Sequence, residues 1–233
     1  MPESSIMPAA TERVIDAPTQ RVIDASIRLL AQKGPAGIKA RSVATEAGVS
    51  TMVVYHHFGG IPELIAAVVD HGFRELGARF AALPVTADPI ADLFTIALTT
   101  REVAQENPHL YDLMFGLSMR STYRPPTTSD AHLSGRSSQF RDAYRHNIAA
   151  CTRLVDSGRI GPHRPKDVAA QLWTMVHGFV SLELADHFAM FKDPSREILQ
   201  QMGINLAVGL GDERDRSVRS HARAMRSFIA NTQ

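Results

Sequence analysis

Apolar residues recur three or four positions apart along most of the chain. The first such run begins at Thr19 and stops at Gly34-Pro35, which predicts an amphipathic helix over that stretch. A longer helix is expected to begin at Pro62, because proline fits the first turn of a helix. Residues 1–18 contain three prolines and show no sustained period, so we expect a flexible tail there.

Three proline-containing pairs mark helix boundaries further along. Asp88-Pro89 and Asp193-Pro194 each place a capping carboxylate before a proline at the first helical position. Asn107-Pro108 predicts a break between two helices. Residues 120–137 crowd proline, serine and threonine without a period, which is typical of a loop between helices. Since no alternating run is long enough for a strand, the pattern predicts an all-α fold with about nine or ten helices.

Residues 39–58 predict two short helices joined by a tight turn. Gly48 stands where the chain must take a left-handed conformation, which glycine adopts without a Cβ clash. The hydroxyl of Ser50 is expected to cap the second helix. The positions expected to face inward are apolar, namely Val43, Ala44, Ala47, Val54 and Phe58.

The outward positions of the second helix are Thr51, Met52, Tyr55 and His56. None is acidic, and each can touch a phosphate, a sugar or a base edge. This is the arrangement of a helix-turn-helix, whose second helix enters the major groove of double-stranded DNA. The candidate DNA-binding residues are therefore Lys39, Arg41, Ser50, Thr51, Met52, Tyr55 and His56.

This region resembles the TetR/AcrR family of transcriptional regulators. The matching elements are the helical lead-in 21–34, then Val43-Ala44, Ala47-Gly48-Val49-Ser50, Tyr55-His56-His57-Phe58 and Glu63-Leu64. The resemblance implies a three-helix DNA-binding domain over 19–64, after the tail 1–18. It also implies a helical domain over 65–233 that binds a ligand and dimerises.

The chain departs from the family pattern at three positions. Lys39 stands where the family commonly has threonine, and Ile61 stands where it has a lysine that contacts the DNA backbone. Lys39 can still reach a phosphate, whereas Ile61 cannot. Met52 replaces the usual small residue of the recognition helix, which is expected to change base preference.

Two later segments, 106–115 and 172–184, resemble a subgroup whose C-terminal domain is named for its Trp-His-Gly residues, here Trp173, His177 and Gly178. A regulator of this kind needs a cavity between helices. The candidate ligand-binding residues are Phe94, Met114, Phe115, Tyr144, Trp173 and His177. The alternative is that these residues form the core of a helical bundle, with His177 as a hydrogen-bonded core histidine.

The charges nearly cancel, with 25 Lys and Arg against 24 Asp and Glu, which excludes a polycation and an acidic disordered chain. Residues 21–62 nevertheless hold five basic residues against two acidic ones, a net +3 per protomer and +6 per dimer. We therefore expect few ionic phosphate contacts and a shallow salt dependence of DNA binding.

The chain shows no pattern for catalysis. No nucleophile–base set, metal-ligand cluster or phosphate loop stands out, so we expect neither an enzyme, nor a cofactor, nor a metal site. The one cysteine, Cys151, cannot form an internal disulfide and is expected to be a small packed residue. The apolar stretch 172–184 is too short to span a bilayer, and no signal peptide is apparent. A cytoplasmic protein without a membrane partner is expected.

The last helix is expected to pack on the bundle through an apolar stripe of Val218, Ala222, Met225 and Ile229. A basic stripe of Arg219, Arg223 and Arg226 would face solvent, with a second nucleic-acid contact as the alternative.

These features together predict a homodimeric, ligand-responsive repressor on a near-palindromic operator, with recognition helices about 34–36 Å apart. The effector would be small and apolar or amphipathic, and dimerisation would use residues 165–191 and 194–210. A transcriptional activator or a regulator without an inducer is the alternative. A helical small-molecule-binding protein or an enzyme is a remote one.

Overall fold

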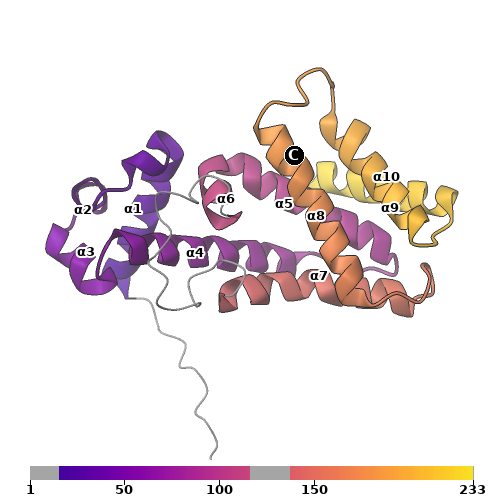
Figure 1. The fold of residues 1–233 in the computed structure, drawn as a ribbon, viewed down its shortest axis with the longest axis horizontal. Coiled ribbons are helices and arrows are strands. Elements are labelled where there is room, and N and C mark those ends of the chain that lie inside the picture. Colours follow the sequence, from indigo (N-terminus) through magenta and orange to yellow (C-terminus); the bar gives the residue numbers. More distant parts are fainter. Residues whose placement is uncertain (1–15, 116–136, 233) are drawn as a thin grey trace, which may run out of the picture. The chain divides into compact units, whose positions relative to one another are not determined.

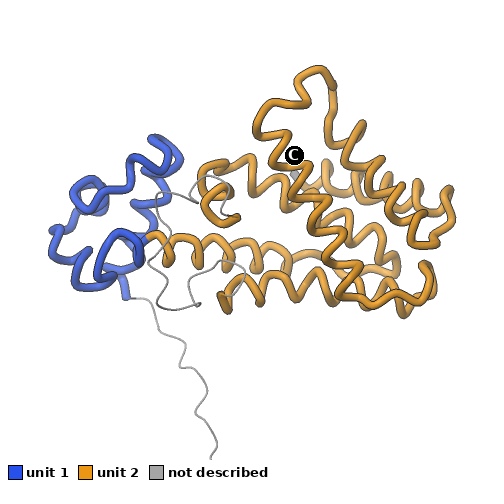
Figure 2. The backbone as a smooth tube through the Cα atoms, in the orientation of Figure 1, with its two compact units in different colours: residues 1–64 blue, residues 65–233 orange. Residues whose placement is uncertain are grey.

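The computed structural model describes residues 16–115 and 137–232, and these fold into helices without a strand (Figure 1). The expected all-α fold is confirmed. The chain forms two compact units, residues 1–64 and 65–233 (Figure 2), and each is described by itself. The helices are α1 Ala17–Lys33, a 3₁₀ turn Pro35–Gly37, α2 Ala40–Ala47, α3 Thr51–Phe58, α4 Ile61–Ala82, α5 Pro89–Glu106, α6 Pro108–Phe115, α7 Ser138–Asp156, α8 Pro165–Leu184, a π-helical turn Ser195–Leu199, α9 Gln200–Gly209 and α10 Arg214–Thr232.

In the first unit, α1, α2 and α3 pack against one another around a small apolar core. Asp16 caps α1 by accepting a hydrogen bond of 2.9 Å from the backbone N–H of Thr19. Because of this cap, the helix begins at Ala17, two residues earlier than the sequence pattern predicts. The buried apolar side chains are Val22, Ile23, Leu29, Leu30, Ile38, Val43, Ala44, Val54 and Leu64.

In the second unit, α5 is the central helix, and α6, α7, α8, α9 and α10 all pack against it. It is buried on nearly every side, as expected of a helix in the middle of a bundle. The predicted cap of α5 is confirmed, because a carboxylate oxygen of Asp88 accepts from the N–H of Ala91 at 3.3 Å. The predicted break is also confirmed, and the side-chain oxygen of Asn107 accepts from Leu110 at 3.0 Å.

The connection after α8 differs from the expected helix pair. The helix ends at Leu184 rather than near Phe191, and Asp186 in the turn that follows has φ 62°. The next helical segment begins as a π-helical turn, Ser195–Leu199. The carboxylate of Asp193 accepts a hydrogen bond of 3.1 Å from the backbone N–H of Arg196, so the expected capping carboxylate is in place. The loop expected over 120–137 lies, except for its last residue, outside the described residues.

A buried ionic cluster joins four segments of the second unit. Arg159, between α7 and α8, donates to both carboxylate oxygens of Asp212 at 3.1 and 2.6 Å. The same guanidinium donates to Asp88 at 2.6 Å and to the hydroxyl of Ser220 at 2.9 Å. Arg223 of α10 reaches the other oxygen of Asp88 at 3.1 Å. The cluster therefore holds α10 against the start of α5.

This cluster corrects the predicted inner face of α10. Val218 and Ile229 were expected to pack inward, but they are 39% and 40% exposed. Met225 is buried as expected, and Ser217 and His221 share the buried face with it. Polar groups lie inside because they have partners there, and α10 is rotated to deliver them. Of the basic stripe, Arg223 pairs with Asp88 rather than facing solvent alone.

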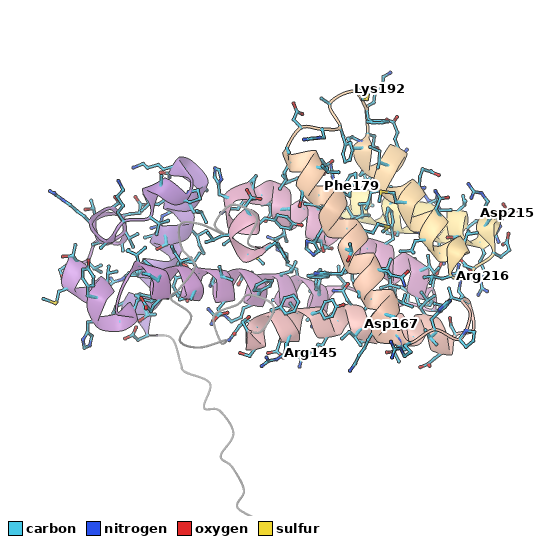
Figure 3. The ribbon with its side chains drawn as sticks, viewed as in Figure 1. Arg145, Asp167, Phe179, Lys192, Asp215 and Arg216 are labelled. Carbon is cyan, nitrogen blue, oxygen red and sulfur yellow. The ribbon has the colours of Figure 1, made fainter. Side chains whose placement is uncertain are left out.

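Figure 3 shows charged side chains projecting from the surface of the second unit. The labelled charged residues are all exposed, whereas Phe179 of α8 is buried; the charged residues are Arg145, Asp167, Lys192, Asp215 and Arg216. No single helix among the described residues has both the length and the hydropathy to cross a bilayer. The pair α3 and α4 passes that test only jointly, with a 71° bend between them.

Candidate nucleic-acid interface and ligand cavity

The turn between α2 and α3 has the geometry that the sequence predicts. Gly48 lies in the left-handed region at φ 66°, and its N–H donates to the carbonyl of Thr45 at 3.2 Å. The N–H of Val49 donates to the carbonyl of Ala44 at 3.0 Å. These bonds end α2 and turn the chain directly into α3, which makes the two helices a helix-turn-helix.

The seven candidate DNA-binding residues all lie at the surface of the first unit. Met52 is 73% exposed and Tyr55 is 52% exposed. Val54, on the opposite side of α3, is fully buried. The helix therefore presents one face to solvent and anchors the other in the core. The seven candidate residues, all of them exposed, are Lys39, Arg41, Ser50, Thr51, Met52, Tyr55 and His56.

Ser50 occupies the cap position of α3 with extended backbone, at φ −77° and ψ 155°. Its hydroxyl makes no capping hydrogen bond, so the predicted capping bond is wrong. The N–H groups in the first turn of α3 consequently receive no capping hydrogen bond from Ser50. Such a helix end attracts anions through its N–H groups and its dipole, and a phosphate can take the place that the cap leaves.

The two adjacent histidines have different surroundings. Nδ1 of His57 is hydrogen-bonded to the hydroxyl of Thr19 at 3.0 Å and lies 3.7 Å from a carboxylate oxygen of Asp16. It therefore ties the end of α3 to the start of α1. His56 is exposed and its ring meets that of His57 edge-on at 5.1 Å. Across the described residues, no three His, Cys, Asp or Glu side chains gather as a metal site would require.

The positive charge of this unit is partly neutralised within the unit itself. Arg28 of α1 forms an ion pair of 2.9 Å with Glu46 of α2. Lys39 and Arg41, at the start of α2, are the exposed cations nearest to the turn in sequence. The charge available to a phosphate backbone is therefore concentrated in few side chains.

The second unit contains a cavity of about 40 Å³ between α5, α7, α8, α9 and α10. Most of its lining is aliphatic or aromatic, and it includes Phe94 and Trp173 of the candidate ligand-binding residues. Four side chains with hydrogen-bonding groups line it, namely Thr100, Asn147, Trp173 and His221.

The other four candidate ligand-binding residues lie outside the lining of this cavity. Phe115, Tyr144 and His177 form an aromatic cluster around Trp173, with ring-centroid distances to Trp173 of 5.9, 5.0 and 4.1 Å. Met114 is buried in the apolar core. Trp173 therefore belongs both to the cavity wall and to the aromatic cluster.

His177 is a hydrogen-bonded interior histidine. Its Nδ1 shares a hydrogen bond with the hydroxyl of Tyr111, and its Nε2 is buried without a partner among the described residues. Burial lowers the pKa of His177 to about 3 and raises the pKa of Tyr111. Both groups are therefore neutral near pH 7.

The sequence reasoning missed the polar groups of the cavity. Asn147 lies four residues before Cys151 and seven before Leu154, on the buried face of α7. A polar residue on an otherwise apolar stripe is a signal that could have indicated it. Cys151 itself is a core residue as expected, and burial raises the pKa of its thiol to about 12. A thiol in this environment is a poor nucleophile.

Comparison with known proteins covers both units. Residues 22–68 match the family model of bacterial regulatory proteins of the tetR family. Residues 93–203 match the model of the tetracyclin repressor-like C-terminal domain. The HTH-type transcriptional regulator BetI of Brucella anthropi is 37% identical over 110 residues, which is 46% of this chain and 53% of BetI. The chain thus matches about half the length of this curated relative.

Solved structures share the fold along most of the chain. A protein of unknown function from Rhodococcus sp. RHA1 superposes with a TM-score of 0.68 at 20% identity, covering 87% of this chain and all of that one. RolR in complex with resorcinol superposes with a TM-score of 0.63 at 14% identity, covering 88% of this chain and 93% of RolR. At these identities the likeness concerns the fold.

Proposed function

Since the chain belongs to the TetR family of transcriptional regulators, we propose that it is a ligand-responsive repressor that binds a near-palindromic operator as a homodimer. The observation that carries the proposal is the helix-turn-helix, in which a Gly48 turn sets α3 with one face buried and one face exposed. That exposed face matches what a recognition helix needs in the major groove. A protein of this kind acts on DNA in the cytoplasm, the compartment that the sequence predicts.

We assign the DNA contacts by side-chain chemistry. Lys39, Arg41 and Tyr55 contact phosphates, and the hydroxyl of Ser50 joins the N-terminal turn of α3 in doing so. The residues that we assign to base edges in the major groove are Thr51, Met52 and His56. Met52 offers an apolar tip suited to a thymine methyl group, and His56 offers a ring N–H or nitrogen lone pair to a base edge.

The proposed dimer interface is the outer face of α8 and α9. Thr174, Gly178 and Leu182 follow one another four residues apart on the exposed side of α8. Met202 of α9 is exposed beside an open apolar groove that also includes Thr174. Small residues on a helix face allow a second copy to approach closely, and a two-fold axis would pair the same face of both protomers.

The proposed effector enters the second unit. The cavity of about 40 Å³ is smaller than the engineered cavity of about 150 Å³ that binds benzene, so a ligand has to widen it. Ligand binding changes DNA affinity only if the two conformations, which differ in the spacing of the recognition helices, bind the ligand with different affinities. We propose that widening of the second unit acts through α4 on the recognition helices. It would favour a spacing of these helices that no longer fits the operator.

A footprinting experiment on the DNA upstream of the protein's own gene tests the DNA-binding assignment. The wild type is expected to protect two half-sites about one helical turn apart. The double variant Tyr55→Ala, His56→Ala is expected to lose protection, whereas His187→Ala, which changes an exposed histidine of the second unit, keeps it. Protection by the double variant would show that α3 is not the recognition helix.

Transcription of a reporter downstream of the protected site distinguishes repressor from activator. A repressor lowers transcription when the protein is supplied, and an effector restores it. Higher transcription on supplying the protein would establish the activator alternative. A protected site with no response to any added compound would establish a regulator without an inducer.

A further inference from the structure

The cavity of the second unit is apolar, but it is not free of hydrogen-bonding groups. Among the residues that the structure describes, no Asp, Glu, Lys or Arg side chain lines it. Burying an ion without a counter-charge is costly, so a ligand of this cavity has to be uncharged. The polar groups in its wall then decide which uncharged ligands fit.

Asn147 of α7, one of the lining residues, carries an unsatisfied donor. The residue is 6% exposed, and its Nδ2 is buried without a hydrogen-bond partner among the described residues. An interior amide N–H without a partner forfeits the hydrogen bond it had in water. A ligand oxygen that accepts from Nδ2 recovers that bond, and an apolar ligand of the same shape does not.

Two further groups in the wall offer acceptors. The hydroxyl of Thr100 donates to the carbonyl of Ile96 at 2.9 Å, so its lone pairs face outward from that bond. Nδ1 of His221 lies 2.8 Å from the carbonyl of Ser217. Because a carbonyl only accepts, Nδ1 carries the proton and Nε2 of the neutral ring is an acceptor.

The wall nearest the surface is formed by side chains that can move. Met175 of α8 and Leu206 of α9 line both the cavity and the open groove outside it. Neither is fully buried, and methionine is the most adaptable apolar side chain. These two residues separate the cavity from the groove, so their displacement enlarges the space available to a ligand.

We propose that this cavity is a binding site for a compact, uncharged, mostly apolar molecule that carries a carbonyl or hydroxyl oxygen, held by a hydrogen bond from Nδ2 of Asn147. This inference rests on the proposed function, because it names the chemical class of the effector.

Three ring compounds of similar size test the proposal on the full-length protein by titration calorimetry. Cyclohexanone carries the oxygen, methylenecyclohexane replaces it by an isosteric CH₂ group, and cyclohexanecarboxylate carries a charge. Wild type is expected to bind cyclohexanone roughly 2- to 12-fold more tightly than methylenecyclohexane, the ratio that one net hydrogen bond provides. It is expected to bind the carboxylate most weakly.

The variant Asn147→Leu is expected to remove this preference, whereas the control Asn231→Leu, at an exposed position of α10, keeps it. A readout in the wild type covers the case that Asn147→Leu does not fold. With the protein labelled on asparagine amides, cyclohexanone is expected to move one side-chain NH₂ pair downfield, and methylenecyclohexane is not.

Equal affinity for cyclohexanone and methylenecyclohexane, binding of neither, or tighter binding of the carboxylate would overturn the inference. These measurements do not involve DNA. If the protein protects its operator but shows no preference for the ketone, the ligand site is wrong and the proposed regulator stands. If it prefers the ketone but protects no DNA, the site stands and the proposed function fails.

Discussion

The hydroxyl of Tyr111 on α6 shares a hydrogen bond with Nδ1 of His177 on α8, while the other ring nitrogen of His177 is buried with no partner in the described part of the chain. The ring is enclosed by aromatic neighbours, with its centroid 4.1 Å from those of both Phe115 and Trp173. Among the described residues, burial alone accounts for the lowered pKa of His177, and no neighbouring charge offsets it. The pair therefore makes the stability of the second unit sensitive to acid.

Replacement of His177 by phenylalanine is expected to weaken the pH dependence of stability. The folded pKa of about 3 lies below the unfolded value of about 6.5, so the unfolded chain takes up the proton first as pH falls. Stability is fully present above pH 6.5 and is lost toward pH 3. Between pH 7.5 and 5.0 the wild type should lose about 2 kcal/mol more than His177→Phe.

Urea unfolding at several pH values measures this difference. His177→Phe leaves the Tyr111 hydroxyl without its partner, so the variant is expected to be less stable at pH 7.5, and the slope with pH carries the test. His187→Phe, at an exposed histidine, should keep the wild-type slope. Parallel curves for wild type and His177→Phe would contradict the prediction.

Gly203 of α9 is expected to tolerate no side chain. A Cβ placed on it would lie 2.5 Å from Nε2 of His221, closer than van der Waals contact permits. Gly203→Ala should therefore cost about 1–3 kcal/mol of unfolding free energy. At Gly209, nothing lies within 4 Å of the corresponding Cβ position, so Gly209→Ala should change stability by less than about 1 kcal/mol. Equal effects of the two variants in thermal unfolding would refute the close approach.

Removal of Arg159 should be among the most damaging changes in the second unit. Arg159→Leu leaves the carboxylate of Asp212 buried and unpaired, which is expected to cost about 3–5 kcal/mol. Arg164→Leu breaks an exposed ion pair with Asp167 and should cost less than about 1 kcal/mol. Adding Asp212→Asn to Arg159→Leu should recover part of the loss in denaturant unfolding. An undiminished loss in the double variant would show that packing, and not charge, is responsible.

DNA binding is expected to depend weakly on salt. If Lys39 and Arg41 of both protomers are the main ionic contacts, log affinity against log salt concentration should have a slope of about −4. Lys39→Ala should reduce that slope by roughly 2 in magnitude, because each dimer loses two contacts. Fluorescence anisotropy with operator DNA at several salt concentrations measures both values. A wild-type slope as steep as about −8 would mean that other cations take part.

Charge on the outer face of α8 should disrupt the proposed dimer. Thr174→Arg places two guanidinium groups near the two-fold axis, so sedimentation of this variant is expected to indicate a monomer. Ala230→Arg, at an exposed position of α10, should sediment like the wild type. A dimer that survives Thr174→Arg would place the interface elsewhere.

The sequence predicts the local features of this molecule well. The Gly48 turn, the exposed face of α3 and the Asp88 cap depend on residues within a few positions of one another, and each is confirmed apart from the bond expected from Ser50. The expected inward packing of Val218 and Ile229 on α10 was wrong because the buried face is set by a contact with Arg159, which lies 61 residues from Ser220. Apolar periodicity carries no information about a polar contact over that separation.

The cavity shows the same limit of local reasoning. Trp173 and Phe94 line it as predicted candidates, and their bulk and apolar character made them visible in the sequence. The role of Asn147 depends on the packing of α7 against α5, since its unsatisfied Nδ2 is a property of the packed unit. Whether any of these residues binds a ligand stays a prediction.

The ion pair between Asp88 and Arg223 joins positions 135 residues apart, and this has a consequence for biosynthesis. A ribosome releases Asp88 and the whole of α5 long before it releases α10. The buried carboxylates of the central helix of the second unit can therefore form all their ion pairs only after the last segment of the chain has been synthesised. Truncation of α10 before Arg223, by a premature stop or by a protease, would remove one of the two cationic partners of Asp88 and favour degradation of the product.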